Sequence, residues 1–227
     1  MFLNEFIELI GTSVCHQLPT RTLMPGGIYM PTCARCSGIY IGFFISAIVL
    51  FLMFRKKESS LPPLYIMIFL ILFILSTIID GALSYFTAVS TNNILRLVTG
   101  VLCGSAIMAI IYPIFNFEYY KDSGEEKIFK RPLKFVVFLV VLAITTLLLL
   151  LDNKVLGVIF YYLDFFSVIF TFYFINTVLI MLIPVFSKKS VKLFSVYLIA
   201  PSLIALAMTA LELFISYRLN VFLENIG

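Results

Sequence analysis

The sequence contains few charged residues. Only 12% of its 227 residues are Asp, Glu, Lys or Arg, whereas 62% are hydrophobic. A soluble globular protein needs more polar side chains than this to cover its surface. The composition therefore excludes a soluble domain and indicates an integral membrane protein.

Other absences narrow the class further. The polar segments between the apolar runs are all too short to form a separate soluble domain. The chain has no nucleic-acid-binding motif, so we expect no nucleic acid among its partners. The first 14 residues contain no cation after Met1, although a secretory signal peptide would need a basic start. We therefore interpret them as a short helix at the membrane interface.

Six apolar runs are long enough to cross a bilayer. A hydrocarbon core about 30 Å thick requires roughly 20 residues per helix, and runs that are continuously apolar favour helices over membrane-spanning strands. The predicted spans are residues 37–54, 64–86, 94–117, 133–151, 155–187 and 191–217.

The expected fold is therefore all-α: a polytopic membrane helical bundle of about six transmembrane helices, with a small Cys/His knuckle on its N-terminal side. We divide the chain into residues 1–36, which hold the interfacial segment and the knuckle, and residues 37–227, which hold the bundle. Two pairs of small residues, Gly38 with Gly42 and Gly100 with Gly104, predict places where helix backbones approach closely.

The distribution of cations predicts the orientation in the membrane. If the first loop between spans faces the cytoplasm, eleven Lys and Arg side chains lie on that side, and five lie outside or at the outer boundary. The eleven are Arg55, Lys56, Lys57, Lys121, Lys127, Lys130, Arg131, Lys134, Lys188, Lys189 and Lys192, and the five are Arg21, Arg35, Arg96, Lys154 and Arg218. Lys and Arg resist translocation, so the Cys/His segment is predicted to face the non-cytoplasmic side. The net charge of +4 favours contact with anionic membrane lipids.

The segment "CHQLPTRTLMPGGIYMPTCARC" holds three of the four cysteines and the only histidine. Cys33 and Cys36 have a spacing that lets two sulfur atoms converge on one metal ion. A turn at Pro25-Gly26-Gly27 would bring Cys15 and His16 back beside them. Four potential ligands in one place predict a zinc site.

Cys15 and His16 are adjacent, and adjacent side chains on a helix point about 100° apart. Both bind one ion only if the backbone is extended or turns there. If only one of them binds, a carboxylate or a water takes the fourth position, and such an open position is typical of catalytic zinc.

The same cysteines allow redox chemistry. A thiolate at a helix N-terminus is stabilised by the backbone N–H groups, so Cys33 and Cys36 also fit a thiol–disulfide oxidoreductase with Cys15 or Cys103 as partner. This reading gives His16 no role, and "CARC" lacks the proline common between such cysteines. A passive structural disulfide is the third reading. Covalent haem attachment is excluded, because Ser37 rather than histidine follows Cys36.

Ionisable residues within the spans are expensive to bury and indicate functional sites. We expect Asp80 and Asp164 to be catalytic, and the predicted topology places them in the outer half of the membrane. The residues expected to bind substrate are Arg96, Arg35, Asn93 and Glu212. Two alternatives stay open: Asp80 and Arg96 neutralise each other, and Asp164 is a hydrogen-bonded acid of the core.

The motifs "CHQLPTR", "PTCARCSGIYIG", "DG" at Asp80 and "NNILRLVTGVLCG" resemble a family of multi-pass membrane proteins, domain of unknown function 2085, over roughly residues 13–105. The positions that match it are Cys15, His16, Gln17, Cys33, Arg35, Cys36, Gly38, Asp80, Asn93, Arg96 and Gly100. The resemblance implies a polytopic protein of prokaryotic type and leaves the reaction open.

Together these features predict metal-assisted chemistry on, or binding of, a lipid-linked or amphiphilic anionic substrate at the outer leaflet. Zinc would lower the pKa of a bound water, Asp80 or Asp164 would act as general base, and the arginines would receive an anionic group such as phosphate. Besides the oxidoreductase, the alternatives are a transporter that uses Asp164 and Glu212 as ion sites and an assembly subunit with a structural knuckle.

Overall fold

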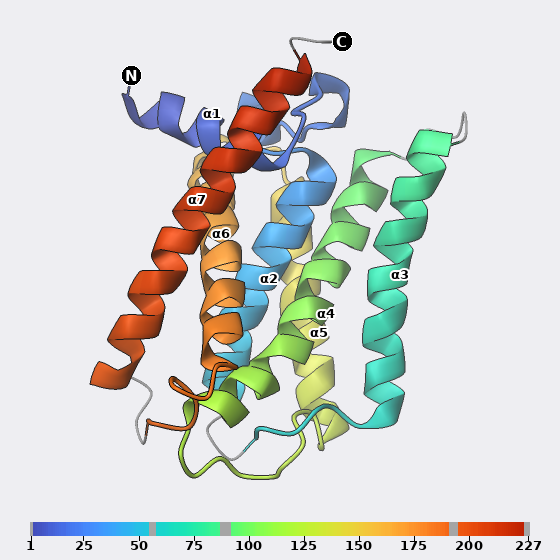
Figure 1. Cartoon of the computed structure of the whole chain (residues 1–227). Helices are drawn as coiled ribbons and strands as arrows, with labels where there is room; N and C mark the ends of the chain where they lie inside the picture. Colours follow the sequence, from blue (N-terminus) through green and yellow to red (C-terminus); the bar gives the residue numbers. More distant parts are fainter. Residues whose placement is uncertain (1, 55–57, 87–91, 191–194, 225–227) are drawn as a thin grey trace.

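A computed structural model describes residues 2–54, 58–86, 92–190 and 195–224. These residues form seven α-helices and three short 3-10 turns: α1 (Phe2–Val14), η1 (Pro19–Arg21), η2 (Pro25–Gly27), α2 (Ala34–Met53), α3 (Leu64–Phe86), α4 (Asn93–Tyr119), α5 (Pro132–Leu150), α6 (Lys154–Met181), η3 (Val196–Leu198) and α7 (Ile199–Glu224). Helices α2 to α7 supply six segments long and apolar enough to cross a membrane. The prediction of an all-α, multi-pass bundle is confirmed (Figure 1).

The limits of the last two spans differ from the predicted ones. Helix α6 ends at Met181 rather than near residue 187, because Pro184 lacks an N–H group and disfavours helical backbone in the residue before it. Helix α7 begins at Ile199, and it continues to Glu224 instead of ending near 217. Residues 191–194, where that span was predicted to start, lie outside the described residues.

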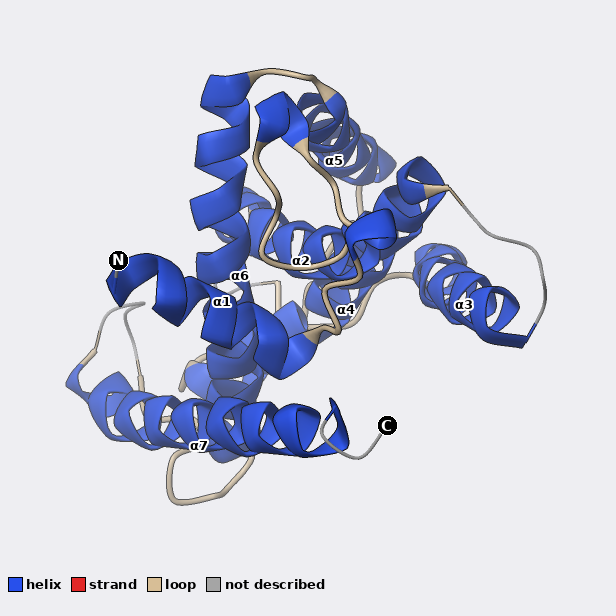
Figure 2. Cartoon of the chain, turned by 90° about the horizontal axis from the view of Figure 1, so that it is seen from above, coloured by secondary structure: helices blue, strands red, loops and turns tan. Residues whose placement is uncertain are grey.

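Helices α2 and α4 occupy the centre of the bundle. Figures 1 and 2 show α3 beside α4 at one edge and α7 beside α6 at another. Helix α1 lies across one end and packs against α7 and α6. We call this the cysteine end, because it carries residues 15–36. We call the opposite end, which holds residues 58–63, 120–131 and 182–190, the lysine end; four of its predicted cations, Arg55, Lys56, Lys57 and Lys192, lie outside the described residues.

The two central helices cross with their backbones in contact, as the small-residue pairs predict. A methyl group on Gly104 would lie 1.9 Å from the carbonyl oxygen of Ile39, and one on Gly38 would lie 2.5 Å from that of Leu97. Both distances are shorter than any real contact. Glycine at these positions therefore sets how closely α2 and α4 approach.

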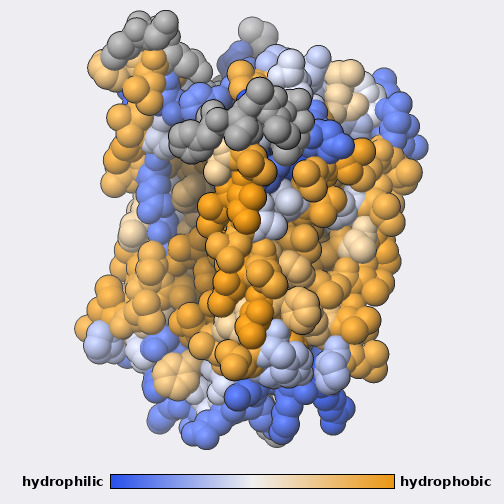
Figure 3. All heavy atoms as spheres, turned by 90° about the vertical axis from the view of Figure 1, so that its right-hand side faces the viewer, coloured by the Kyte–Doolittle hydropathy of each residue, from blue (hydrophilic) through white to orange (hydrophobic). Residues whose placement is uncertain are grey.

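The outside of the bundle is apolar between its two ends. Figure 3 shows a hydrophobic band over the middle of the molecule, with hydrophilic residues gathered toward both ends. Large apolar side chains near the middle of the outer helices are exposed, among them Leu72 on α3, Val140 on α5 and Leu211 on α7. Such a continuous apolar surface matches the hydrocarbon region of a bilayer.

Gly104→Ala should destabilise the bundle by about 1–3 kcal/mol, because the added methyl group overpacks the α2–α4 contact. Gly81→Ala is the matched control: it also lies within a helix, and the nearest group to its added methyl is the Arg35 side chain at 3.7 Å. Thermal denaturation in detergent compares the two variants. Equal midpoints for Gly104→Ala and Gly81→Ala would show that the helices do not depend on this contact.

Candidate metal centre

The segment between α1 and α2 folds as a hairpin. Thr22 and Cys33 form an antiparallel bridge, and the Met30 N–H donates to the Leu23 carbonyl at 3.1 Å. The turn contains Gly26 and Gly27, both with positive φ, of 60° and 79°. The turn predicted at Pro25-Gly26-Gly27 is confirmed, and it returns the chain so that Cys33 lies beside Cys15.

Neighbouring helices hold this hairpin at the end of the bundle. The Gly26 N–H donates to Asp152, in the α5–α6 connection, at 2.8 Å. The Asn93 side chain at the start of α4 donates to the Thr20 carbonyl at 3.2 Å, and Gln17 donates to the Pro31 carbonyl at 2.8 Å. The hairpin is thus fixed along both of its strands.

Three cysteines meet where the hairpin joins α2. Cys15 directly follows α1, Cys33 is the N-cap of α2, and Cys36 lies in the first turn of α2. Their Sγ atoms all lie within 4.8 Å of one another, and none is in a disulfide. Thiolates that share a tetrahedral zinc ion are about 3.8 Å apart, since each Zn–S bond is about 2.3 Å. A small contraction would therefore let all three bind one ion.

Hydrogen bonds within this cluster favour a thiolate at one of the cysteines. The Cys15 sulfur accepts from the Cys33 N–H at 3.3 Å and from the Gln17 N–H at 3.4 Å. Hydrogen bonds from the Cys15 and Cys36 thiols hold the pKa of Cys33 well below its usual range, and the same bond to Cys33 raises the pKa of Cys15. Of these two thiols, Cys33 is therefore the more acidic, and an ion bound by all three cysteines would displace their remaining protons.

His16 lies outside the sulfur cluster. Its side chain is exposed, whereas Cys15 beside it is buried. The backbone turns immediately afterwards, since Gln17 has φ of 48°. Of the four predicted ligands, the structure therefore brings together Cys15, Cys33 and Cys36 and leaves His16 exposed outside this group.

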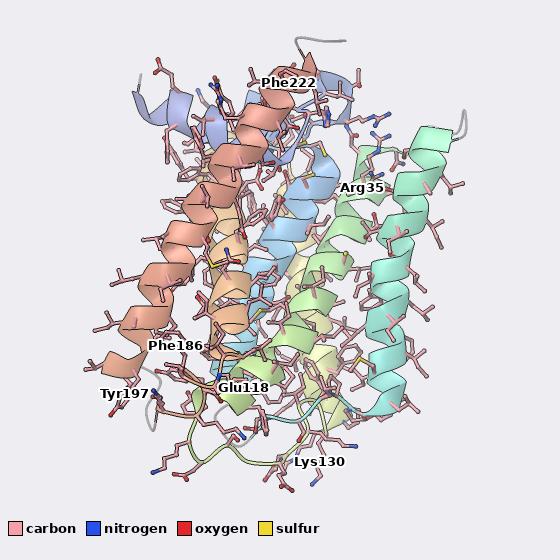
Figure 4. All side chains as sticks on the ribbon, viewed as in Figure 1. Arg35, Glu118, Lys130, Phe186, Tyr197 and Phe222 are labelled. Carbon is pink, nitrogen blue, oxygen red and sulfur yellow. The ribbon has the colours of Figure 1, made fainter. Side chains whose placement is uncertain are left out.

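A cavity of about 190 Å³ opens against the three sulfurs. Its wall also contains His16, Gln17 and three arginines, which are Arg21 from the hairpin, Arg35 from α2 and Arg96 from α4. Figure 4 shows Arg35 at this end of the molecule, near side-chain sulfur and nitrogen atoms. Sulfur ligands and guanidinium groups thus face the same small space.

A larger cavity, of about 430 Å³, lies between α2, α4 and α6 toward the lysine end. Phenylalanine and aliphatic side chains form most of its wall, and the hydroxyl groups of Tyr173 and Thr177 already bond to Ser202 and to the Tyr173 carbonyl. It offers no group for acid–base or metal chemistry, so the smaller cavity is the candidate site.

Asp80 pairs with Arg35. The Arg35 Nε donates to Asp80 Oδ2 at 2.8 Å, and a second guanidinium N–H contacts the same oxygen. The guanidinium also reaches the Asp80 carbonyl and the Ser84 hydroxyl. Arg96, the partner considered from the sequence, instead donates to Asn93 at 3.3 Å. Asp80 is 4% exposed and does not line the cavity.

The other two acids also lie away from the cavity wall. Asp164 on α6 is fully buried, and its Oδ2 accepts from Thr32 at 2.9 Å and from Ser37 at 3.2 Å. Glu212 on α7 accepts from Asn176 at 2.9 Å. The cavity wall therefore contains the thiols, the imidazole and the arginines, whereas the carboxylates lie behind or apart from it.

Comparisons with known proteins place this site in a family. A family described as "Predicted membrane protein (DUF2085)" matches residues 15–110. An uncharacterised protein of Methanothermobacter thermautotrophicus is 32% identical over 97 residues, which cover 43% of this chain and 83% of that protein. The chain belongs to the family of domain of unknown function 2085. The chain is also similar to an uncharacterised protein of Methanocaldococcus jannaschii, which is 28% identical over 120 residues, 53% of this chain and 75% of that protein.

No solved structure matches this member of the 2085 family. The family match begins at Cys15 and ends within α4. It therefore contains the three cysteines and the three arginines of the cavity, together with Asp80. Asp164 and Glu212 lie beyond the matched residues.

Sequence reasoning missed three contributors to the site. Arg21 was counted only as a cation, although it lies on the hairpin strand that was predicted to fold back. Thr32 and Ser37 directly flank Cys33 and Cys36, so their position next to the motif was the available signal. Their shared partner Asp164 is more than 120 residues away in sequence, and no local pattern connects them.

In this 2085-family protein, Asp80→Ala should lower the free energy of unfolding by roughly 3 kcal/mol, because it leaves the Arg35 guanidinium partly buried without its carboxylate. The control is Glu58→Ala, which breaks the more exposed Lys134–Glu58 pair at 3.7 Å and should cost less than about 1 kcal/mol. Denaturant titration in detergent measures both. A loss for Asp80→Ala no larger than for Glu58→Ala would contradict the assignment of a stabilising pair.

Proposed function

We propose that the protein binds one zinc ion through Cys15, Cys33 and Cys36, and that this centre binds or acts on an anionic, amphiphilic or lipid-linked substrate. The observation that carries the proposal is the shared cavity. Three sulfurs within 4.8 Å of one another line the same space as three arginines.

The ligand set supports zinc. Thiolates bind zinc well, and a three-ligand protein site leaves a fourth position for water or substrate. The described residues supply no fourth ligand within the cluster, and the three cysteines line the cavity, so water or a substrate atom in the cavity would take that position. Bound there, the ion would supply a Lewis acid to an oxygen atom of the substrate.

The arginines support an anionic substrate. Guanidinium groups bind phosphate and carboxylate oxygens with directed hydrogen bonds. A cavity of about 190 Å³ is smaller than typical sites that enclose whole ligands, which are about 300–1,000 Å³. It would therefore receive a headgroup, while the apolar part of the substrate stays in the bilayer. The position of Cys36 in the first turn of a membrane-spanning helix supports this placement at the membrane surface.

The predicted orientation indicates on which side of the membrane the substrate would lie. With the lysine end in the cytoplasm, as the positive-inside rule favours, the cavity would face the non-cytoplasmic side. The substrate would then be one of the outer leaflet, and the membrane lipids there are the first partners to test.

Purified protein should contain about one zinc per chain, and Cys15→Ser, Cys33→Ser and Cys36→Ser should each reduce the content strongly, because a site with two thiolates holds zinc poorly. Cys103→Ser is the matched control, since Cys103 is a free, buried cysteine on α4 outside the cluster. His16→Ala should also retain the ion. Elemental analysis measures each protein. A metal-free wild type with oxidised Cys33 and Cys36 would reject zinc and favour the thiol–disulfide oxidoreductase.

Arg96→Gln and Arg21→Gln should each weaken binding of short-chain phosphatidic acid about tenfold or more, because a charge-assisted hydrogen bond contributes about 1.5–3 kcal/mol. Arg218→Gln removes a cation near the same end that is not part of the cavity and should bind as wild type does. Titration calorimetry in detergent, with inorganic phosphate in a parallel series, separates recognition of the headgroup alone from recognition of the whole amphiphile. Equal affinity of all three variants would contradict the assigned cavity.

A further inference from the structure

The hydroxyl groups on either side of the Cys-x-x-Cys motif share one acceptor. Thr32 immediately precedes Cys33, and Ser37 immediately follows Cys36. Both hydroxyls bond to the same oxygen, Asp164 Oδ2, at 2.9 and 3.2 Å. The two hydroxyl oxygens are also 2.9 Å apart, so the proton of either hydroxyl can be donated to the carboxylate or to the other hydroxyl. The residues at both ends of the motif therefore contact a single carboxylate, which belongs to helix α6.

This carboxylate cannot touch a substrate in the cavity. The side chains of Asp164, Thr32 and Ser37 are all fully buried, and none of them lines the cavity. The second carboxylate oxygen, Oδ1, has no hydrogen-bond partner among the described residues. Burying an acid in this way costs stability. A role for Asp164 at this site would therefore have to act through the two hydroxyl groups that it contacts.

The residues that carry these hydroxyls are joined to the cysteines through the backbone. The hydrogen bond to Asp164 holds Thr32, which directly precedes Cys33. The Cys33 N–H in turn donates to the Cys15 sulfur. The second hydrogen bond to Asp164 holds Ser37, which directly follows Cys36. The Ser37 N–H also donates to the Cys33 carbonyl in the first turn of α2. Each of the three cysteines is thus linked to Asp164 through Thr32 or Ser37, by hydrogen bonds and one or two backbone residues.

Helix α6 is a rigid support for this arrangement. Near its start, Gly157 packs against the Pro25 carbonyl of the hairpin turn, and Asn153 caps the helix by accepting from Val155 and Leu156. About two turns further along α6, Asp164 makes a second contact between this helix and the hairpin, through Thr32. The metal-binding loop is therefore held between α2 and α6 rather than by α2 alone.

We propose that Asp164 is a positioning residue of the metal centre, which sets the spacing of Cys15, Cys33 and Cys36 through Thr32 and Ser37. This inference rests on the proposed zinc site and replaces the catalytic role expected for Asp164 with a supporting one. Groups that orient metal ligands from the outer shell change metal affinity about 10–100-fold when removed.

The test compares Asp164→Leu with Asp164→Asn in the full-length protein. Leu removes the acceptor, so zinc affinity in a chelator competition should fall about 10–100-fold, and the absorption bands of the cobalt-substituted protein should change. Asn keeps a carbonyl oxygen for Thr32 and Ser37, so it should restore both affinity and spectrum nearly to those of wild type. Loss of affinity in Asp164→Asn equal to that in Asp164→Leu would overturn the proposal.

Asn176→Leu is the matched control for general destabilisation. Asn176 is buried on the same helix and loses hydrogen bonds to Thr209 and Glu212, but it lies outside the site. Its zinc affinity should equal that of wild type, and an equal loss in the two Leu variants would overturn the positioning role. If Asp164→Leu does not fold, the Thr32→Val and Ser37→Ala double variant removes the same bonds, and wild-type affinity in that protein would overturn the proposal.

A metal-independent measurement separates this inference from the zinc proposal. A short bifunctional thiol reagent should cross-link Cys15 to Cys33 faster in wild type and Asp164→Asn than in Asp164→Leu. If wild-type protein binds no zinc but the cross-linking rates differ in this way, the zinc proposal fails and the positioning role stands. Equal cross-linking rates in all three proteins would overturn the positioning role.

Discussion

The backbone contact between α2 and α4 determines where everything at the cysteine end lies. The glycines of the two helices face one another, and the Arg35 carbonyl lies where a side chain on Gly100 would be. This contact places the first turn of α2, with Cys36, against the first turns of α4, with Arg96. Bulkier residues would move the helices apart, and with them Cys36 and Arg96, which line the same cavity. The close approach of two apolar helices thus determines the geometry of a polar site.

Much of the fold and part of the site could be predicted from the sequence, because these features depend on local pattern. Span length follows from bilayer thickness, and the hairpin follows from the Pro-Gly-Gly turn. The partner of Asp80 could not be predicted, since Arg35 and Arg96 both lie in the first turn of their helices and only the packing of those helices selects between them. Asp164 was recognised as unusual, but its depth behind the motif depends on the rotation of α6 about its axis, which an apolar sequence does not encode.

The acids and the arginines of this protein serve different purposes. Asp80 neutralises Arg35, and Asp164 accepts hydrogen bonds from the edges of the cysteine motif. Neither faces the cavity, so the open space is bordered by sulfur, imidazole and guanidinium groups. Chemistry there, if an ion is bound, would depend on the metal and on cationic groups and not on a carboxylate base. The family match contains the cavity wall, whereas Asp164 comes from α6 beyond it.

The exclusion of His16 from the cluster has a further consequence for ion selectivity. A ligand set of sulfur alone, with neither nitrogen nor oxygen from the protein, favours soft cations and gives little hold on magnesium, calcium or manganese. If the three cysteines bind an ion, thiophilic ions such as copper(I) would compete well for the same thiolates.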